Sequence, residues 1–240
     1  MSNRRLFYAT IAQDFDTLMN PYDLERRLTI VFDELLPPDL TGLRTLDLGC
    51  GTGWFSQQAA QRGAQVVSLD ISRRLVEITH HRAHTQSVVG DAICLPFASA
   101  CFDLIISSEM IEHLANPTLG IQEIARLLAP GGTLVLTTPN RRWLWLVNLA
   151  THLRLRPYAG YENFVGFKEL EHRIRSTGLD VEIHFGFHPW PFQCTPLQRL
   201  SRYVDKHYGR SAWGKWMINQ ALRAHKPKSK TDVVDKNTQP

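Results

Sequence analysis

Short apolar runs alternate with longer stretches in which apolar residues recur at helical spacing, from about residue 44 to residue 137. The apolar runs predict five strands: Thr45–Leu48, Gln65–Leu69, Val88–Val89, Leu104–Ile106 and Thr133–Thr137. The amphipathic stretches between them predict three helices: Trp54–Arg62, Ser72–His84 and Thr118–Leu128. Strands that alternate with helices form a mostly parallel sheet with helices on both faces, so we expect a doubly wound α/β fold.

The chain before this region predicts a helix over 23–36, which Asp23 can cap and which Pro37-Pro38 ends. After Pro139 the rhythm changes, and an apolar insert at 141–156 is flanked by arginines. A helix over 167–176 and a strand over 179–187 are predicted next, but no convincing seventh strand follows Phe187. The remaining chain is predicted to be helical in two pieces before a polar end. We therefore divide the chain into a helical cap (1–40), a main domain (41–190), a basic helical extension (191–225) and a disordered tail (226–240).

The composition is that of one large globular domain, with or without an appendage, because 240 residues contain 43% hydrophobic and 21% charged residues. Four cysteines at irregular spacing form no C-x-x-C pair, which disfavours a zinc ribbon or a disulfide framework. No signal peptide and no apolar run of about 20 residues is present. We expect a cytoplasmic protein, with peripheral contact to the inner face of a membrane left open.

The net charge of +4 is distributed unevenly along the chain. Residues 199–240 carry ten Lys and Arg against three Asp and Glu, whereas the rest of the chain is mildly acidic. A basic, aromatic-containing end of this kind can bind anionic lipid or nucleic acid, or simply form a solvated helical face. The acidic body and the lack of an appended RNA-binding module argue against nucleic acid as a partner.

The glycine-rich segment after the first predicted strand, Leu46-Asp47-Leu48-Gly49-Cys50-Gly51-Thr52-Gly53, indicates a ligand-binding turn. Glycines let the backbone approach a ligand closely, and in doubly wound sheets this turn lies at the carboxyl ends of the strands. The third glycine comes one residue earlier than dinucleotide folds require. The carboxylate of Asp47 just before the loop suits a positive charge better than a pyrophosphate, which favours a cationic nucleoside–amino-acid ligand over NAD.

Two further carboxylates end the next two predicted strands. Asp70 lies 21 residues after Gly49, where a carboxylate can accept hydrogen bonds from both ribose hydroxyls. Asp91, in the segment Gly90-Asp91-Ala92, is placed to bond an adenine amino group. Together these positions predict a nucleoside site along one edge of the sheet.

The ordered motifs LDLGCGTG, SLDIS, GDAICLPF, FDLIISSEMIEHL and LLAPGGTLVLTTPN, from about Leu43 onward, closely resemble class I S-adenosylmethionine-dependent methyltransferases. The resemblance implies a seven-stranded sheet whose last strand is antiparallel. It implies that Asp47 and the glycine loop hold the amino-acid part of S-adenosylmethionine, Asp70 the ribose, and Asp91 and Ala92 the adenine, with Ser107 near the methionine end. The full set of expected cofactor-binding residues is Asp47, Gly49, Cys50, Gly51, Gly53, Asp70, Ile71, Asp91, Ala92 and Ser107.

The segment after the fourth predicted strand carries a second chemical signal. If Glu109 begins a helical turn, Glu109, Glu112 and His113 share one face at i, i+3 and i+4. Two carboxylates and an imidazole can hold a divalent cation such as Mg²⁺, and without metal His113 can act as the general base. This E-x-x-E-H element resembles that of ubiquinone-biosynthesis O-methyltransferases, which implies a magnesium-assisted reaction on a catechol. Phe15-Asp16 stands where that family has a tryptophan pair.

The apolar insert RRWLWLVNLATHLRLR is open to three interpretations. Tryptophans with flanking arginines are typical of a helix in a lipid headgroup layer. The same helix is also suited to a lid over a hydrophobic substrate, or to packing on the protein body or in a dimer.

The leading functional prediction is O-methylation of a hydroxylated, hydrophobic small molecule such as a quinone precursor, with Glu109, Glu112 and His113 facing the acceptor. Tyr8, Phe15 and Tyr22 are candidates for a cap that closes over the cofactor. The alternatives are methylation of a sugar or other natural-product intermediate on O, N or C, and a non-catalytic protein that only binds the cofactor. The sequence leaves the oligomeric state open.

Overall fold

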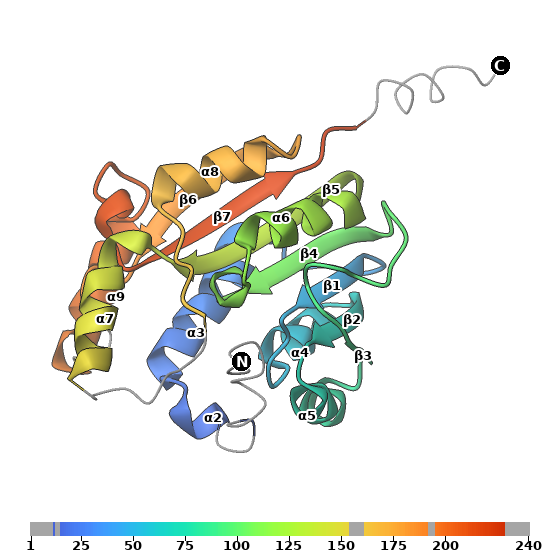
Figure 1. The fold of residues 1–240 in the computed structure, drawn as a ribbon, viewed down its shortest axis with the longest axis horizontal. Coiled ribbons are helices and arrows are strands. Elements are labelled where there is room, and N and C mark those ends of the chain that lie inside the picture. Colours follow the sequence, from blue (N-terminus) through green and yellow to red (C-terminus); the bar gives the residue numbers. More distant parts are fainter. Residues whose placement is uncertain (1–11, 13–14, 154–160, 192–194, 229–240) are drawn as a thin grey trace.

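The computed structural model describes residue 12 and residues 15–153, 161–191 and 195–228. Its centre is a seven-stranded sheet in the order β3-β2-β1-β4-β5-β7-β6 (Figure 1). The strands are β1 (Arg44–Leu48), β2 (Gln65–Asp70), β3 (Gln86–Val89), β4 (Phe102–Ser108), β5 (Leu128–Pro139), β6 (Asp180–Phe187) and β7 (Asn219–His225). The first five strands pair in parallel, and β7 runs antiparallel to both β5 and β6. The predicted fold, including the antiparallel last strand, is confirmed.

Strand β7 corrects the prediction that the second half of the basic extension is helical. Asn219–His225 reads NQALRAH, and Ala, Leu, Arg and Gln are good helix formers when considered locally. The segment forms a strand because β5 and β6 hydrogen-bond to it on both sides and bury Ala221, Leu222 and Ala224 completely. The amide nitrogen of Gln220 donates to the carbonyl oxygen of Val165 at 2.7 Å, so its polar side chain is satisfied inside the sheet.

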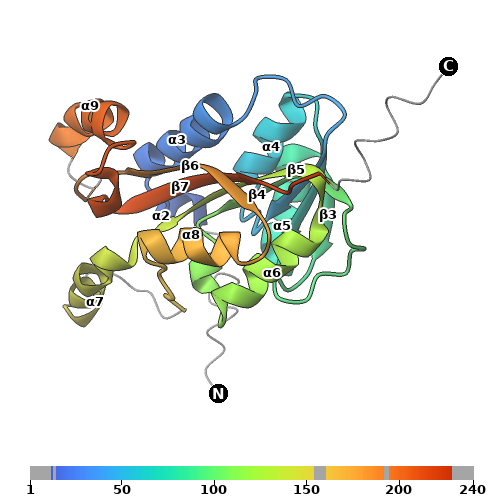
Figure 2. The same cartoon turned by 90° about the horizontal axis from the view of Figure 1, so that it is seen from above.

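Helices cover both faces of the sheet (Figure 2). One face carries α3 (Pro21–Thr29) with the π-helical turn Ile30–Leu35 that continues it, and α4 (Trp54–Gln61). Apolar side chains of these elements pack against β4, β5, β6 and β7 in one buried cluster that includes Phe32, Leu35, Phe55, Ile106 and Phe185. Helix α5 (Arg73–Ala83) packs on β2 and β3. Asn20, not Asp23 as we expected, caps α3 by accepting from the backbone of Tyr22 and Asp23.

The opposite face carries α6 (Pro117–Leu127) and α8 (Phe167–Arg175) (Figure 2). Buried Ile121, Ile124, Leu170 and Ile174 of these helices pack against inward-facing strand residues such as Leu134. Because both faces are covered, the central strands bury apolar residues on both sides of the sheet, which explains the short apolar runs in the sequence.

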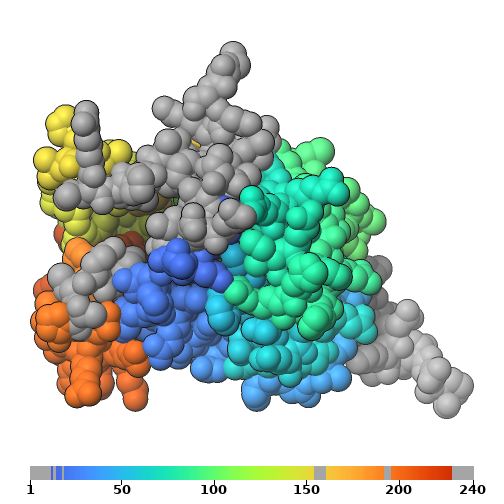
Figure 3. Space-filling view, turned by 90° about the horizontal axis from the view of Figure 1, so that it is seen from below, coloured from blue at the N-terminus to red at the C-terminus, as the bar shows by residue number. Residues whose placement is uncertain are grey.

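Three helices lie outside these layers. Helix α2 (Phe15–Leu18) precedes α3, α7 (Leu144–His152) follows β5, and α9 (Gln198–Tyr208) follows β6. Helices α7 and α9 lie at one end of the molecule, away from α4 and α5 (Figures 2 and 3). Helix α9 confirms the first predicted piece of the C-terminal extension, while Tyr8, Cys194 and most of the expected tail lie outside the described residues. Within the described chain, no helix is long and apolar enough to span a bilayer.

Candidate active site

A cavity of about 720 Å³ opens at the carboxyl ends of the parallel strands. Gly49 follows β1, Asp70 ends β2, Asp91 follows β3 and Ser108 ends β4, and all four residues line the cavity. Strands β1 and β4 are neighbours whose connections leave toward opposite faces of the sheet, which creates the crevice in which doubly wound folds bind ligands.

The glycine loop forms one wall of the cavity and requires glycine for two separate reasons. Gly49 and Gly53 have φ angles of 80° and 89°, in the left-handed region that other residues rarely adopt. A Cβ atom on Gly49 would overlap the side chain of Met110, and one on Gly53 would lie 2.9 Å from a methyl group of Thr79. The loop therefore packs too closely on its neighbours to accept larger residues.

Asp70 is held rigidly at the edge of the cavity. Its Oδ2 accepts from the backbone N–H of Gly51 at 3.1 Å, and its Oδ1 accepts from the N–H of Ser72 at 2.9 Å. Burial raises the pKa of this carboxyl above its usual value, although the backbone donors oppose that shift. This geometry fixes an acceptor group beside the glycine loop.

Most of the expected cofactor-binding residues line the cavity, but three do not. Those that do are Gly49, Cys50, Gly51, Asp70, Ile71, Asp91 and Ala92. Asp47, Gly53 and Ser107 lie behind the wall. Asp47 is 2% exposed and accepts from the Ser56 hydroxyl at 2.5 Å, and burial raises its pKa to about 7. Asp47 thus bonds to Ser56 of α4 behind the cavity wall, whereas the sequence predicts that it contacts the amino-acid part of the cofactor.

Arg27 and Asp23 of α3 line the cavity and were not predicted as site residues. Arg27 is 6% exposed, its Nε donates to Asp23 Oδ2 at 2.9 Å, and its Nη1 donates to Ser108 Oγ at 3.1 Å. Burial opposes its charge, but the nearby carboxylates, Asp23 foremost, raise the pKa of Arg27. A buried guanidinium therefore faces the cavity near the end of β4. The one signal in the sequence is an Asp–Arg pair at i, i+4 within a predicted helix, which does not show that the pair faces a cavity.

Glu109, Glu112 and His113 all line the cavity but do not share a helical face, so that expectation was wrong. Glu109 has a φ of 52°, and the helical turn begins only at Ile111 as a 3-10 turn, Ile111–His113. Glu109 Oε2 accepts from Asn219, whereas Glu112 Oε2 accepts from Thr138. Among the described residues, no three His, Cys, Asp or Glu side chains are arranged to hold a metal ion. The residues present therefore do not fit the expected magnesium site.

The two glutamates have unusual acid–base properties. Burial, with the neighbouring charge of Glu112 as the next cause, raises the pKa of Glu109 to about 8. Burial raises the pKa of Glu112 to about 7. His113 Nδ1 lies 2.9 Å from the carbonyl oxygen of Tyr161, which can only accept, so Nδ1 of this ring carries a proton. In the neutral imidazole Nε2 is then the basic nitrogen, 3.7 Å from Glu112 Oε1.

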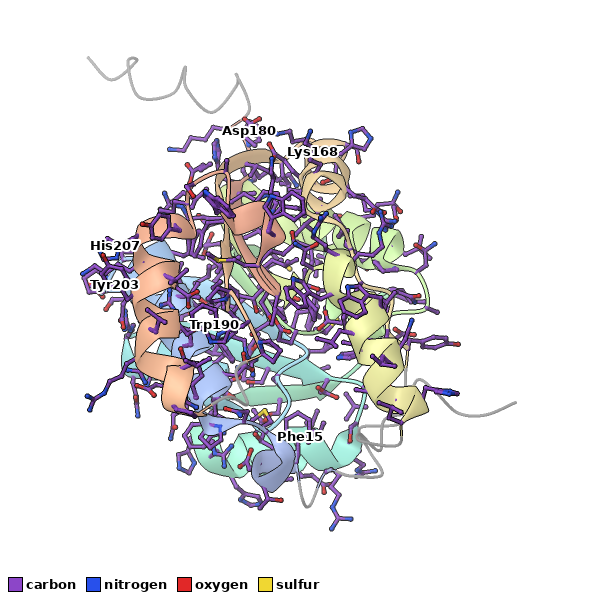
Figure 4. The ribbon with its side chains drawn as sticks, turned by 90° about the vertical axis from the view of Figure 1, so that its left-hand side faces the viewer. Phe15, Lys168, Asp180, Trp190, Tyr203 and His207 are labelled. Carbon is purple, nitrogen blue, oxygen red and sulfur yellow. The ribbon has the colours of Figure 1, made fainter. Side chains whose placement is uncertain are left out.

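The N-terminal segment closes part of the cavity over the glycine loop. Phe15 lines the cavity, and a Cβ on Gly51 would lie 3.5 Å from its ring. Asp16 fixes this segment because its carboxylate accepts from Thr52 and Arg82, at 2.6 Å each. Figure 4 shows Phe15 on α2 at the end of the molecule where this cap lies. Tyr22, the other described cap candidate, is buried instead and donates to the carbonyl oxygen of Gln198.

Comparison with known proteins adds independent information. A family model described as "Methyltransferase domain" matches residues 46–136. The chain is 35% identical over 184 residues to a ubiquinone biosynthesis O-methyltransferase from Xanthomonas oryzae pv. oryzae, covering 71% of this chain and 75% of that protein. It is also 35% identical over 176 residues to a biotin biosynthesis bifunctional protein from Cellvibrio japonicus, covering 70% of this chain but only 35% of that protein.

Solved structures share the fold at lower identity. One is an S-adenosylmethionine-dependent methyltransferase from Mesorhizobium loti, with a TM-score of 0.63 and 21% identity over 83% of this chain and 97% of that chain. The similarity extends through the seven-stranded sheet rather than being confined to the glycine loop.

Proposed function

The chain belongs to the class I S-adenosylmethionine-dependent methyltransferases, and from that premise we propose that it methylates a hydroxyl group on a fairly hydrophobic small molecule, such as a quinone precursor. This proposal is based mainly on the side chains that line the cavity beyond the glycine loop. There a basic imidazole nitrogen and two carboxyls of raised pKa lie beside apolar side chains, among them Met19, Leu24, Leu114 and Phe164. The names of the curated relatives favour a quinone-type acceptor.

In this proposal, different residues of the chain bind different parts of S-adenosylmethionine. Asp70 accepts from the ribose hydroxyls, and Asp91 with Ala92 contacts the adenine. The glycine loop contacts the amino-acid part of the cofactor. The carboxylate of that part pairs with the guanidinium of Arg27, which places a positive charge near the end of β4. When bound, S-adenosylmethionine supplies an electrophilic methyl group on its sulfonium.

His113 acts as the general base. The acceptor oxygen forms a bond to the methyl carbon while the carbon–sulfur bond breaks, and the hydroxyl proton moves to Nε2 of His113. Glu112 stabilises the resulting imidazolium, because its Oε1 lies 3.7 Å from that nitrogen. The remaining tasks of the site are to align the two reactants and to exclude water.

Methyl transfer from labelled S-adenosylmethionine to a catechol with a short prenyl tail tests the proposal. The same catechol with both hydroxyls already methylated is the matched control acceptor. Transfer that persists in EDTA supports His113 as the base, whereas transfer only with Mg²⁺ contradicts that route. No transfer despite tight binding of S-adenosylhomocysteine would contradict the acceptor class and leave the methyltransferase assignment intact.

We also propose that one face of the molecule contacts anionic lipid, which would bring the enzyme to a hydrophobic acceptor. This tryptophan face comprises Trp145 and Leu149 of α7 with Trp213 and Trp216, and Trp145 and Trp213 are 63% and 70% exposed. The two parts adjoin because Trp143 donates to the carbonyl oxygen of Trp216 at 2.8 Å. No residue of α7 is buried or lines the cavity, which favours lipid contact over packing or a lid.

Cations accompany these aromatic side chains. The guanidinium of Arg142 lies 3.3 Å from the centre of the Trp216 ring, and both Arg141 and Arg142 are exposed at the start of α7. Tryptophan beside arginine is the combination expected at an anionic headgroup layer. Figure 3 shows α7, in yellow, at the edge of the molecule.

A further inference from the structure

His188 has no part in the site described above, yet its environment is unusual. It follows β6, has a φ of 60° and is completely buried. Few non-glycine residues adopt this left-handed conformation, and those that do are held by the surrounding structure. Such positions concentrate near functional sites, and the contacts of His188 lead to the cavity.

The backbone of His188 is held by α9. Its N–H donates to Asp205 Oδ1 at 2.8 Å, and the other oxygen of Asp205 accepts from Arg26 Nε at 3.1 Å. Its carbonyl oxygen accepts from the N–H of Ile218 at 2.9 Å. These bonds on both sides fix the turn in which the ring of His188 is presented to α3.

The ring of His188 continues the chain of contacts into the cavity. Its Nε2 lies 3.0 Å from Asp23 Oδ1, and because Arg27 and His188 keep the pKa of Asp23 low despite its burial, that oxygen accepts from Nε2–H. The other oxygen of Asp23 accepts from Arg27 Nε at 2.9 Å. Asp23 thus has one oxygen on His188 and the other on the arginine that faces the cofactor.

We propose that His188 and Asp205 are positioning residues that hold Arg27, through Asp23, in the orientation that binds the amino-acid carboxylate of the cofactor. Arg27 has competing partners, because Glu109 and Glu112 lie close enough to influence its charge. With His188 in place, Asp23 cannot rotate away, and the guanidinium stays directed at Ser108 and the end of β4. Without it, Arg27 can turn toward the glutamates at the acceptor end of the cavity.

The inference gives the C-terminal segment a role in cofactor binding. Besides the pair of Arg26 with Asp205, two more contacts join α9 to α3: Tyr22 donates to the carbonyl oxygen of Gln198, and Arg202 pairs with Glu25. Helix α9 therefore contacts α3 through Tyr22, Glu25 and Arg26, none of which lines the cavity. Tyr203 and His207 of α9 lie at the outer edge of the molecule (Figure 4). The inference rests on the proposed contact between Arg27 and the carboxylate.

Calorimetry on the full-length chain with two ligands separates positioning from a merely structural role. S-adenosylhomocysteine carries the amino-acid carboxylate, whereas 5′-methylthioadenosine keeps the nucleoside and lacks that group. His188→Asn tolerates the left-handed backbone but is too short to reach Asp23. We expect this variant to bind S-adenosylhomocysteine on the order of 10- to 100-fold more weakly, the size of one lost charge-assisted hydrogen bond, and methylthioadenosine within about twofold.

Matched variants complete the design. His188→Gln, whose amide can reach Asp23, should recover most of the affinity. His184→Asn is the control, because His184 lies on β6, four residues before His188, has a side chain that is only 4% exposed, bonds to Gln220 and does not line the cavity. It should leave the ratio of the two affinities unchanged. Equal weakening of both ligands by His188→Asn, or no weakening of either, would overturn the inference.

Two further variants distinguish failure of the positioning role of His188 from failure of the proposed Arg27–carboxylate contact. Arg27→Met should reproduce the selective loss, and adding His188→Asn to it should change nothing more. If Arg27→Met has no selective effect, the proposed carboxylate contact fails; if it does and His188→Asn does not, only the positioning role fails. Should His188→Asn not fold, Asp23→Asn decides, because it removes the charge that holds Arg27 while keeping the side-chain shape.

Discussion

Asp70 is the single residue on which ribose binding is expected to depend. Its carboxylate is already oriented by the N–H groups of Gly51 and Ser72, so little ordering is needed when a ligand arrives. Asp70→Ala should weaken S-adenosylhomocysteine binding by roughly 1–3 kcal/mol, measured by calorimetry. Asp180→Ala, at an exposed aspartate on the far edge of the sheet, is the control. Unchanged affinity in Asp70→Ala would remove the ribose role.

His113 is expected to affect turnover and not cofactor affinity. Its Nδ1 is engaged by the carbonyl of Tyr161, which leaves Nε2 as the nitrogen that can take a proton. His113→Ala should lower the rate of methyl transfer by on the order of 10²- to 10⁴-fold, the usual contribution of a general base, with S-adenosylhomocysteine affinity kept within about twofold. His81→Ala, at an exposed histidine of α5, serves as the control. Turnover that survives in His113→Ala would exclude this histidine as the base.

The site residues that could be predicted are those whose role is visible in the local sequence. Gly49 and Asp70 stand next to strand ends, where a turn and a ligand contact are both expected. Arg27 could not be predicted, because its role depends on how α3 packs over β4, a contact between residues 81 positions apart. The burial of Asp47 behind the cavity wall could not be predicted, because the sequence does not show that the Ser56 hydroxyl bonds to its carboxylate.

Lipid binding is expected to depend on the whole exposed face of helix α7, because that face rather than a single residue would enter the headgroup layer. Trp145→Glu with Leu149→Glu should reduce co-sedimentation with phosphatidylglycerol vesicles by tenfold or more, because each large apolar side chain contributes roughly 1.5–3 kcal/mol when buried. Leu119→Glu, at an exposed leucine on α6, is the control. Binding of the wild type should weaken in high salt. A wild-type chain that never co-sediments would contradict the lipid contact.

Strands and helices could be predicted where one pattern dominates the sequence. Strands β1, β2 and β4 contain short runs rich in Leu, Val and Ile because helices cover both sides of the sheet. Strand β7 could not, because residues such as Ala221, Leu222 and Arg223 are good helix formers and show no strict alternation of apolar and polar positions. Its strand conformation is imposed by β5 and β6, and pairing with a distant strand leaves no local trace in the sequence.

At the scale of the whole molecule, three buried carboxyls have raised pKa values and affect the stability of the fold over the same pH range. Burial raises the pKa of Glu109 to about 8 and the pKa values of Glu112 and Asp47 to about 7. In the unfolded chain such groups titrate near pH 4, so between these limits the folded state holds protons that the unfolded state has released. Stability must then fall as pH rises through the folded pKa values. Carboxyls of lowered pKa, such as Asp16, act only below about pH 4.

We therefore expect the free energy of unfolding of the cofactor-free protein, measured in urea, to be lower at pH 8.5 than at pH 6.5. For each proton released on unfolding, this free energy can fall by at most about 1.4 kcal/mol per pH unit. This range avoids His184, whose pKa burial lowers and whose effect of opposite sign lies below about pH 6.5. Glu109→Gln, a neutral amide at the same site, should flatten the profile, whereas Glu77→Gln on exposed α5 should not. A stability that rises over this range would mean that these carboxyls are ionised in the folded protein, and the acceptor end of the cavity would then be strongly negative.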